Sequence, residues 1–404
     1  MKGKRGFFNK IFAYTFLCIN ILVCIWSALC YMASVVSPAK VENIGMLSLS
    51  TAFAFFANIF FVFFWLFTRK KWRSLIAVVT LILCSKIFLP VFGWNFFTSS
   101  SNEVHSSALK VMDWNVHAFG LYDTDSEGKR QQMMDVIKEN APDILCMEEY
   151  NVMKDDSMAP YTKQIMEENG YKEYRFRADN KFENNKDIYL GTAMFSKFPL
   201  KNFVAYPLDV RRRIIENGAS YLLQADVSLP GNKMLRLFAL HLYSSGITSN
   251  DINYIEELKG RKVNGTDDPD YDPDFIDELN RRNIKPSDHF RVFMFKLSLA
   301  YRKRALEADS VAKVVSSSPY PVLICGDFND VPSSYTYTTI RGKFADAFVS
   351  KGKSLGRTFN EIMPTLRIDD IFYDPSLLKA VAYKTPYLFL SDHKPVIALF
   401  EIKH

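Results

Sequence analysis

Three long apolar runs occupy the first hundred residues, and they restrict the folds open to this chain more than any other feature. They cover about residues 11–36, 45–67 and 74–97. Each reaches the roughly 20 residues that a helix needs to cross the hydrocarbon core of a bilayer. A cleavable signal peptide fits the first run less well, because the run is long, lacks a clear small-x-small cleavage site and is followed by two more. We therefore expect three transmembrane helices.

Basic residues flank these runs unevenly. Four precede the first run and four separate the second from the third, whereas the first connection holds one lysine and one glutamate. Because positively charged loops stay in the cytoplasm, we expect a cytoplasmic N-terminus. Three crossings then place the chain after about residue 100 on the periplasmic or extracellular side. The expected location is the inner membrane of a bacterium, crossed several times.

The positive charge of the chain belongs to this N-terminal part. Residues 1–102 hold ten of the 50 Lys and Arg residues but one of the 44 acidic residues, and the rest of the chain has 40 basic and 43 acidic residues. Binding of nucleic acid regardless of its sequence depends on many contacts between Lys or Arg and phosphates. The charge balance therefore argues against sequence-independent binding of nucleic acid by the C-terminal part, although a local basic patch is compatible with it.

The pattern changes after residue 108, where short strand-like runs alternate with turn residues and a few helical stretches. Residues 1–98 form the expected membrane anchor, 99–108 a polar linker and 109–404 a separate domain. A majority of strands with fewer helices predicts layered α/β structure with sheets at the core. The predicted strands cover 109–114, 144–147, 191–195, 221–227, 235–242, 322–325, 368–372 and 396–400, and the predicted helices 129–140, 159–169 and 287–316.

Polar side chains lie at the ends of six of these predicted strands. Turn chemistry alone is a poor explanation for six such clusters in one domain. Carboxylates and amides are the ligands that a hard cation such as Mg²⁺ prefers, and histidine suits proton transfer. No zinc-type Cys and His cluster and no Walker-type glycine loop accompanies them. The residues concerned are Asn115, Glu148, Glu149, His241, Asp327, Asn329, Asp369, Asp392 and His393.

Seven short motifs occur in order and resemble those of the endonuclease/exonuclease/phosphatase superfamily, which has the fold of DNase I. Gly326-Asp327-Phe328-Asn329 and Ser391-Asp392-His393 are the most specific pair. The resemblance covers about residues 109–402. It implies a membrane-anchored bacterial member with a four-layer α/β/β/α sandwich and a site at one rim. The remaining motifs are Asn115 and the segments 143–149, 191–199, 239–242 and 367–369.

The resemblance also implies metal-dependent hydrolysis of a phosphoester, with Mg²⁺ as the cofactor and Mn²⁺ as an alternative. Its motifs assign the metal to Asn115, Glu149 and Asp392. Two positions depart from the family pattern. Glu148 stands where the family usually has Gln, and His117 stands where many members have Asp. We expect His117 on the substrate side or at the surface, and the extra charge of Glu148 could alter the affinity for the metal.

The same motifs imply roles for five further residues. Asp327 and Asn329 would position and activate the water that attacks in line with the leaving group. His393, oriented by Asp369, would act as a base or hold the scissile phosphate. His241 would donate to a non-bridging oxygen as charge builds. These roles are positioning and electrostatics, the usual sources of rate in phosphoryl transfer.

Three functions remain open on the sequence. The first is a membrane-anchored phosphodiesterase resembling the endonucleases and exonucleases. The second keeps the chemistry but acts on a phospholipid, a sphingomyelin-like lipid or an inositol phosphate. The third is a catalytically silent binding module, which the complete set of site residues argues against. The expected partners are the phosphoester substrate and the lipid bilayer, and the sequence indicates no protein partner. The run 211–213 of three arginines is either a phosphate contact or a solvated loop, and the Asp-rich stretch 246–285 reads as a solvated excursion.

Overall fold

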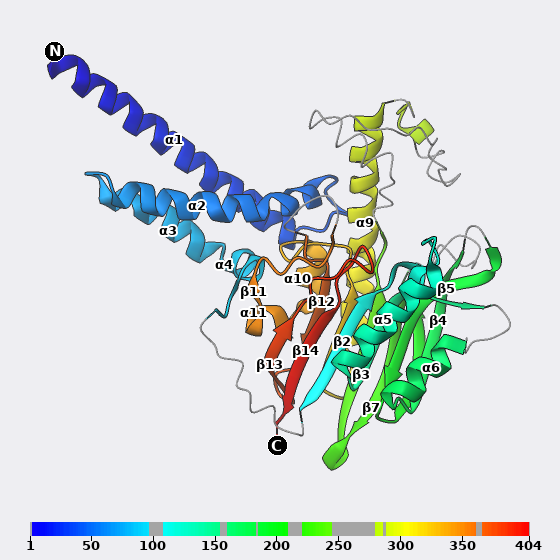
Figure 1. Ribbon diagram of the computed structural model, residues 1–404. Coiled ribbons are helices and arrows are strands. Elements are labelled where there is room, and N and C mark those ends of the chain that lie inside the picture. The colour runs from blue at the N-terminus through cyan, green and yellow to red at the C-terminus, as the bar shows by residue number, and fades with distance from the viewer. Residues whose placement is uncertain are drawn as a thin grey trace.

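The computed structural model describes most of the chain. Its described residues are 2–96, 108–153, 160–182, 185–208, 220–244, 279–285, 288–360 and 366–403. Nearly all of the expected linker, the three arginines at 211–213 and most of the stretch 246–285 lie outside them. Two six-stranded sheets and the helices that cover them form the C-terminal part (Figure 1).

Each large sheet has one parallel pair of strands at its centre and antiparallel neighbours on both sides. In the first sheet the parallel pair is β2 (Leu109–Asn115) and β3 (Ile144–Met153). In the second it is β8 (Lys233–His241) and β9 (Val322–Asp327). The strand order in the first sheet is β13 (Leu378–Lys384), β14 (Val396–Ile402), β2, β3, β5 (Asn185–Ser196) and β4 (Glu173–Phe182). The strand order in the second sheet is β10 (Ala345–Asp346), β12 (Asp369–Tyr373), β9, β8, β7 (Tyr221–Leu229) and β6 (Leu200–Pro207).

Helices cover the outer face of each sheet. A core of apolar residues from both sheets fills the space between them. A second core joins the outer face of the first sheet to α5 (Ser126–Asn140) and α6 (Pro160–Asn169), and a third joins the second sheet to α9 (His289–Ser316) and α10 (Tyr335–Arg341). The expected α/β/β/α order of layers is therefore present. Burial of one face of each helix and both faces of each sheet is what stabilises such a sandwich.

The N-terminal helices only partly match the three expected spans. Two stretches are long and apolar enough to cross a membrane, Ile11–Val35 within α1 (Lys2–Val35) and Ile44–Leu66, which joins η1 (Ile44–Ser50) to α2 (Thr51–Leu66). The third expected span is broken, because Lys71–Leu83 and Ser85–Val91 meet at a bend of 70°. The number of candidate spans is thus two, or three if the bent pair crosses as one.

The third stretch bends at Cys84, where the α3 helix (Ser74–Leu83) ends and the short α4 helix (Ser85–Phe88) begins. Helical structure then stops in the 3-10 turn around Pro90. Proline has no amide hydrogen and cannot continue a helical ladder. The chain then forms β1 (Gly93–Trp94), which pairs with β11 (Lys353–Ser354) of the C-terminal part instead of extending the helix.

Candidate active site

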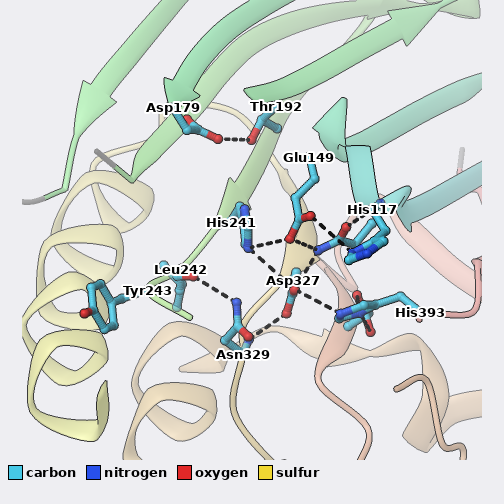
Figure 2. Close-up of polar contacts among 12 residues, drawn as sticks. His117, Glu149, Asp179, Thr192, His241, Leu242, Tyr243, Asp327, Asn329 and His393 are labelled. Atoms are coloured by element: carbon cyan, nitrogen blue, oxygen red, sulfur yellow. Dashed lines mark hydrogen bonds and ion pairs between the residues drawn. The ribbon is translucent and has the colours of Figure 1, made fainter. Parts of the chain in front are cut away.

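The parallel strands of both sheets end at the same rim of the sandwich, which brings the polar strand ends together (Figure 2). In the second sheet His241 is paired with Asp327, and Asp327 is paired with Asp369 of β12. In the first sheet Asn115 ends β2 beside β3. Its side-chain amide donates to Asp327 Oδ2 across the gap between the sheets at 3.1 Å. The rim therefore joins residues from both sheets into one site.

Glu149 reaches the site through an irregularity in β3. The pairing of β3 with β5 shifts between Met147 and Tyr150, and Glu149 has a φ of 51°. Positive φ is uncommon for residues other than glycine, and bulges often re-aim side chains next to active sites. Here the bulge turns the Glu149 side chain toward the rim, where its Oε1 accepts from Asn115 Nδ2 at 3.1 Å.

Asp327 lies at the centre of the site and is almost completely buried. Its Oδ2 is 3.7 Å from His241 Nε2 and 3.7 Å from His393 Nε2. Its Oδ1 accepts from the Asn329 amide at 2.8 Å. Burial raises the pKa of Asp327, and the two histidines oppose this effect. One carboxylate thus faces two imidazoles and one backbone donor.

His393 is buried and held by a carboxylate from the second sheet. Its Nδ1 lies 3.0 Å from both oxygens of Asp369, which leaves Nε2 facing Asp327. Burial alone would lower the pKa of His393, but the charges of Asp369 and Asp327 outweigh it and hold that pKa well above the ordinary value. His393 is therefore cationic at neutral pH. His241 has a raised pKa for the same reason, with Asp327 and Glu149 outweighing the effect of burial.

Asn329 and His117 complete the rim from its two sides. The side chain of Asn329, whose φ is 52°, donates to the carbonyl of Leu242 at 2.9 Å. His117 is 43% exposed and has its Nδ1 3.4 Å from Asp392 Oδ2 and 3.7 Å from Glu149 Oε2. It stands at the mouth of the site, between two residues expected to hold the metal.

Asp179 lies beside the site, although no motif in the sequence marks it. It lies within β4, and its Oδ2 accepts from Thr192 Oγ1 at 3.2 Å. Burial raises its pKa to about 7, and the nearby His241 opposes that rise. Figure 2 shows Asp179 and Thr192 beyond His241 and Glu149. A carboxyl with this pKa changes its charge near neutral pH, and its ionised form raises the pKa of His241.

Glu148 points into the core instead of adding charge to the rim. Glu148 and Asp113 are both 0% exposed, and none of their four carboxyl oxygens has a hydrogen-bond donor among the described residues. Burial raises both pKa values well above the ordinary range, and the charge of Asp113 raises the pKa of Glu148 further. A protonated carboxyl of one can then donate to the other, so the pair is a neutral or singly charged structural unit beneath the site.

The model of one protein family, described as the endonuclease/exonuclease/phosphatase family, matches residues 114–393. This chain belongs to the endonuclease/exonuclease/phosphatase family. The predicted family is confirmed, and its members are hydrolases of phosphoester bonds. A second model, for a domain of unknown function, matches residues 9–92. No curated protein matches the chain.

Several solved structures resemble this family member at low sequence identity. A protein of the same family from Beutenbergia cavernae is 19% identical, with a TM-score of 0.49, covering 73% of this chain and 72% of that one. The human Nocturnin catalytic domain with bound sulfate is 16% identical, with a TM-score of 0.48, covering 74% and 95%. A protein of the family from Bacteroides thetaiotaomicron is 16% identical, with a TM-score of 0.47, covering 74% and 98%. The family assignment rests on the family model.

The family typically uses a divalent metal, and the donor set at the rim fits one. Glu149, Asp327 and Asp392 supply carboxylates and Asn115 supplies an amide, which are oxygen ligands of the kind that Mg²⁺ and Mn²⁺ take. Within the described part of the chain, none of these carboxylates forms an ion pair with Lys or Arg, and their charged neighbours are histidines. The residues present therefore suit a hard cation better than a structural ion pair.

Proposed function

We propose that this protein is a membrane-anchored, metal-dependent phosphodiesterase that hydrolyses its substrate by in-line attack of water. One observation carries the proposal. Asp327, buried at the rim, lies 3.7 Å from the Nε2 atoms of both His241 and His393, and Asp369 holds His393 from behind. A buried carboxylate between two histidines offers an acceptor for a proton and two donors for phosphate oxygens at one place.

Asn115, Glu149 and Asp392 would hold the Mg²⁺ or Mn²⁺ ion. When bound, such a cation offsets the negative charge of a phosphoester and polarises the phosphorus–oxygen bond. The support for this assignment is that side chains with oxygen atoms able to bind a metal lie close together. The side-chain amide of Asn115 donates a hydrogen bond to Glu149 at 3.1 Å, and His117 lies between Glu149 and Asp392. His117 stands at the mouth, where it can contact a phosphate entering the site.

Asp327 and Asn329 would handle the attacking water. Asp327 can accept a proton from that water, because among the described residues its Oδ2 is held by Asn115 and by the more distant histidines. Asn329 is fixed at two atoms, since its amide donates to Asp327 and its side chain donates to the Leu242 carbonyl. Groups fixed in this way lower the entropy cost of bringing water and phosphate together.

His393 and His241 would stabilise the charge that develops on the phosphate. Their raised pKa values favour the cationic form of both imidazoles, so they suit donation to phosphate oxygens better than abstraction of a proton. Of the two roles expected for His393, holding the scissile phosphate is therefore the one we propose. Donors preorganised toward developing charge are commonly the largest single contribution to catalysis.

A lipid or inositol phosphoester is the second candidate for the substrate, beside nucleic acid. The observation that favours it is the pair of N-terminal helices that are long and apolar enough to cross a membrane. We propose that residues 1–98 anchor the protein in the inner membrane of a bacterium, and that residues 109–404 form the catalytic domain on the periplasmic or extracellular side. The positive flanks of the helices support this orientation.

The full-length protein in detergent, with Mg²⁺, tests the proposed function. It is offered bis-p-nitrophenyl phosphate, plasmid DNA, RNA and phospholipid vesicles, beside the His393→Ala variant. We expect the wild type to turn over the small diester and at least one biological substrate, and the variant to lose that activity. Turnover of lipid without cleavage of DNA would support the lipid or inositol phosphoester as the substrate. Absence of turnover of every substrate would contradict the proposal that the protein is an enzyme. A reporter fused to the C-terminus tests the orientation, which is wrong if the reporter is active only in the cytoplasm.

A further inference from the structure

Two loops that carry site residues also touch the N-terminal helices. The first loop, residues 327–334, follows Asp327 and contains Asn329. The second loop, residues 366–369, ends at Asp369. Both pack against the part of residues 2–96 that lies nearest the sandwich, beside α9, α10 and β11 in Figure 1. The two loops therefore connect the helical segment to the site, within a wider contact of that segment with α9, α10 and α11 (Ala347–Lys351).

The first loop is bonded directly to the turn between α1 and α2. Ser333 Oγ donates to the carbonyl of Ser48 at 3.0 Å, and Ser48 Oγ donates to Tyr301 OH of α9 at 3.4 Å. All three side chains are buried. Gly45 lies flat against the Tyr301 ring, because a Cβ at that position would come within 2.6 Å of it. The approach is close enough that only glycine fits.

The same contact continues from Tyr301 to the site. The Arg304 guanidinium lies over the Tyr301 ring at 4.8 Å, and its Nε is 3.5 Å from Asp330 Oδ2. Arg304 and Asp330 are each 2% exposed. Because Asp330 follows Asn329 in the chain, this buried ion pair fixes the backbone next to a residue proposed to position water. Asp330 thus stabilises the first loop and takes no part in the chemistry.

The second loop is bonded to the end of the third helical stretch. Arg367 is 1% exposed, and its Nη2 donates to the carbonyl of Pro90 at 3.2 Å and to Asp346 Oδ2 at 3.0 Å. Its Nη1 also contacts Asp370. Arg367 is therefore shared between the helical segment and two carboxylates of the domain, of which Asp370 directly follows Asp369 in the chain. Nearby, Gly93 of β1 lies so close to the backbone of β11 that a Cβ there would be 2.4 Å from Gly352.

We propose that the N-terminal helical segment positions the two loops of the active site and is more than a membrane tether. This inference rests on the proposed function. Gly45, Ser48 and Pro90 on the helical side, with Ser333 and Arg367 on the other, are its positioning residues. A tether needs no buried hydrogen bonds to the domain it carries, whereas these contacts lie within a few residues of Asp327, Asn329 and Asp369. Catalytic groups need a supporting shell that holds them to within about 0.5 Å.

The first part of the test measures whether the two parts stay together. A protease site is inserted within residues 97–107 of the full-length protein, and membranes are sedimented after cleavage. We expect most of the cleaved C-terminal part of the wild type to sediment with the membranes. Gly45→Val and Gly93→Val should release it, because each adds a side chain where no space exists. Gly6→Val, near the far end of α1, is the matched control and should leave it bound.

The second part measures what separation does to the site. We use bis-p-nitrophenyl phosphate because a small soluble substrate makes tethering to the membrane irrelevant. We expect the Gly45→Val and Gly93→Val proteins to lose at least about tenfold in kcat, or to need about tenfold more Mn²⁺ for half-saturation. Mn²⁺ binding, followed by electron paramagnetic resonance, gives a readout that needs no turnover.

A pair of arginine variants separates positioning from general stability. Arg367→Met removes the contact with Pro90, and Arg236→Met is its control, because Arg236 forms a similar ion pair with Asp226 at the opposite end of the second sheet. We expect Arg367→Met to weaken Mn²⁺ binding and Arg236→Met to leave it unchanged.

Three results would overturn the inference. The first is release of the wild-type C-terminal part from the membranes after cleavage. The second is a released C-terminal part that has the same activity and the same affinity for Mn²⁺ as the bound one. The third is an equal effect of the two arginine variants on Mn²⁺ binding. Absence of turnover in the uncleaved wild type would instead count against the proposed function. The Mn²⁺ measurements would then still test whether the helical segment positions the site.

Discussion

His393 Nδ1 lies 3.0 Å from both carboxylate oxygens of Asp369, so a buried carboxylate fixes the orientation of this imidazole and favours its cationic form. The two residues come from different sheets, because Asp369 belongs to β12 and His393 precedes β14. The pair therefore depends on correct packing of the whole sandwich.

Replacing Asp369 with Asn should lower the pKa of His393 and the activity together. The carboxylate is the main cause that raises this pKa, so its loss favours the neutral imidazole. If the cationic form is needed, the alkaline limb of the pH–rate profile moves to lower pH and kcat at pH 8 falls about 100-fold or more. Asp226→Asn, which alters an ion pair remote from the site, serves as the control. A uniform loss without any shift of the profile would contradict this account.

Replacing Asp179 with Asn should matter mainly above neutral pH. The pKa of Asp179 is raised to about 7, so its carboxyl is neutral below that value and anionic above it. Only the anionic form helps to keep His241 protonated. We expect the variant to match the wild type near pH 6 and to fall to about a tenth of its kcat at pH 8.5. Equal loss at both pH values would show that Asp179 serves only to hold β4 in place.

Replacing Glu148 with Gln should make stability less sensitive to pH. The pKa values of Asp113 and Glu148 are raised by burial, so the folded state holds protons that the unfolded state releases. The stability that these protonated carboxyls contribute is present below their ordinary pKa values, near 4, and is lost as the pH rises toward the raised values. The Gln amide can donate to Asp113 without titrating. We expect the variant to be more stable than the wild type at pH 8, by about 1 kcal/mol or more, and not at pH 4. Thermal unfolding at the two pH values measures this, and the same difference at both would contradict it.

Replacing Glu149 with Gln should weaken metal binding without disturbing the fold. The Gln side chain keeps the size of the glutamate but loses the charge that attracts a divalent cation. We expect at least about tenfold weaker Mn²⁺ binding, as for loss of a metal-site residue, and an unchanged unfolding temperature in the absence of metal. Asp392→Asn should behave in the same way. If Mn²⁺ binds both variants as tightly as the wild type, the metal lies elsewhere.

The sequence was sufficient to predict the central strands and three helices of the sandwich, α5, α6 and α9, but not the short helix α10. Buried central strands are apolar along most of their length, so runs such as 322–325 and 396–400 stood out and became β9 and β14. Six of the described strands were not predicted: β1, β4, β6, β10, β11 and β13. Of these, β4, β6, β10 and β13 are the edge strands of the two large sheets, where pairing is on one side and the apolar pattern is weak, and β1 and β11 are two-residue strands. The third expected span was predicted as one continuous helix, because hydropathy does not register a bend, whereas the structure has two helices that meet at 70°.

The same reasoning explains what was found and missed at the site. Polar residues at the ends of central strands were predicted to meet, and they do, since parallel strands of both sheets end at one rim. Asp179 was missed because it lies inside the edge strand β4 and not at a strand end. Glu148 and Glu149 look alike in sequence, and only the bulge in β3 sends one into the core and the other to the rim.

The most direct test of the central claim is hydrolysis of bis-p-nitrophenyl phosphate by the full-length protein in ¹⁸O-labelled water. Wild type is compared with Glu149→Gln and His393→Ala, each with EDTA and then with added Mg²⁺ or Mn²⁺. The account predicts turnover by the wild type that EDTA abolishes and metal restores, one ¹⁸O atom in the phosphate product, and little turnover by either variant. Metal-independent turnover, or variants as active as the wild type, would contradict it.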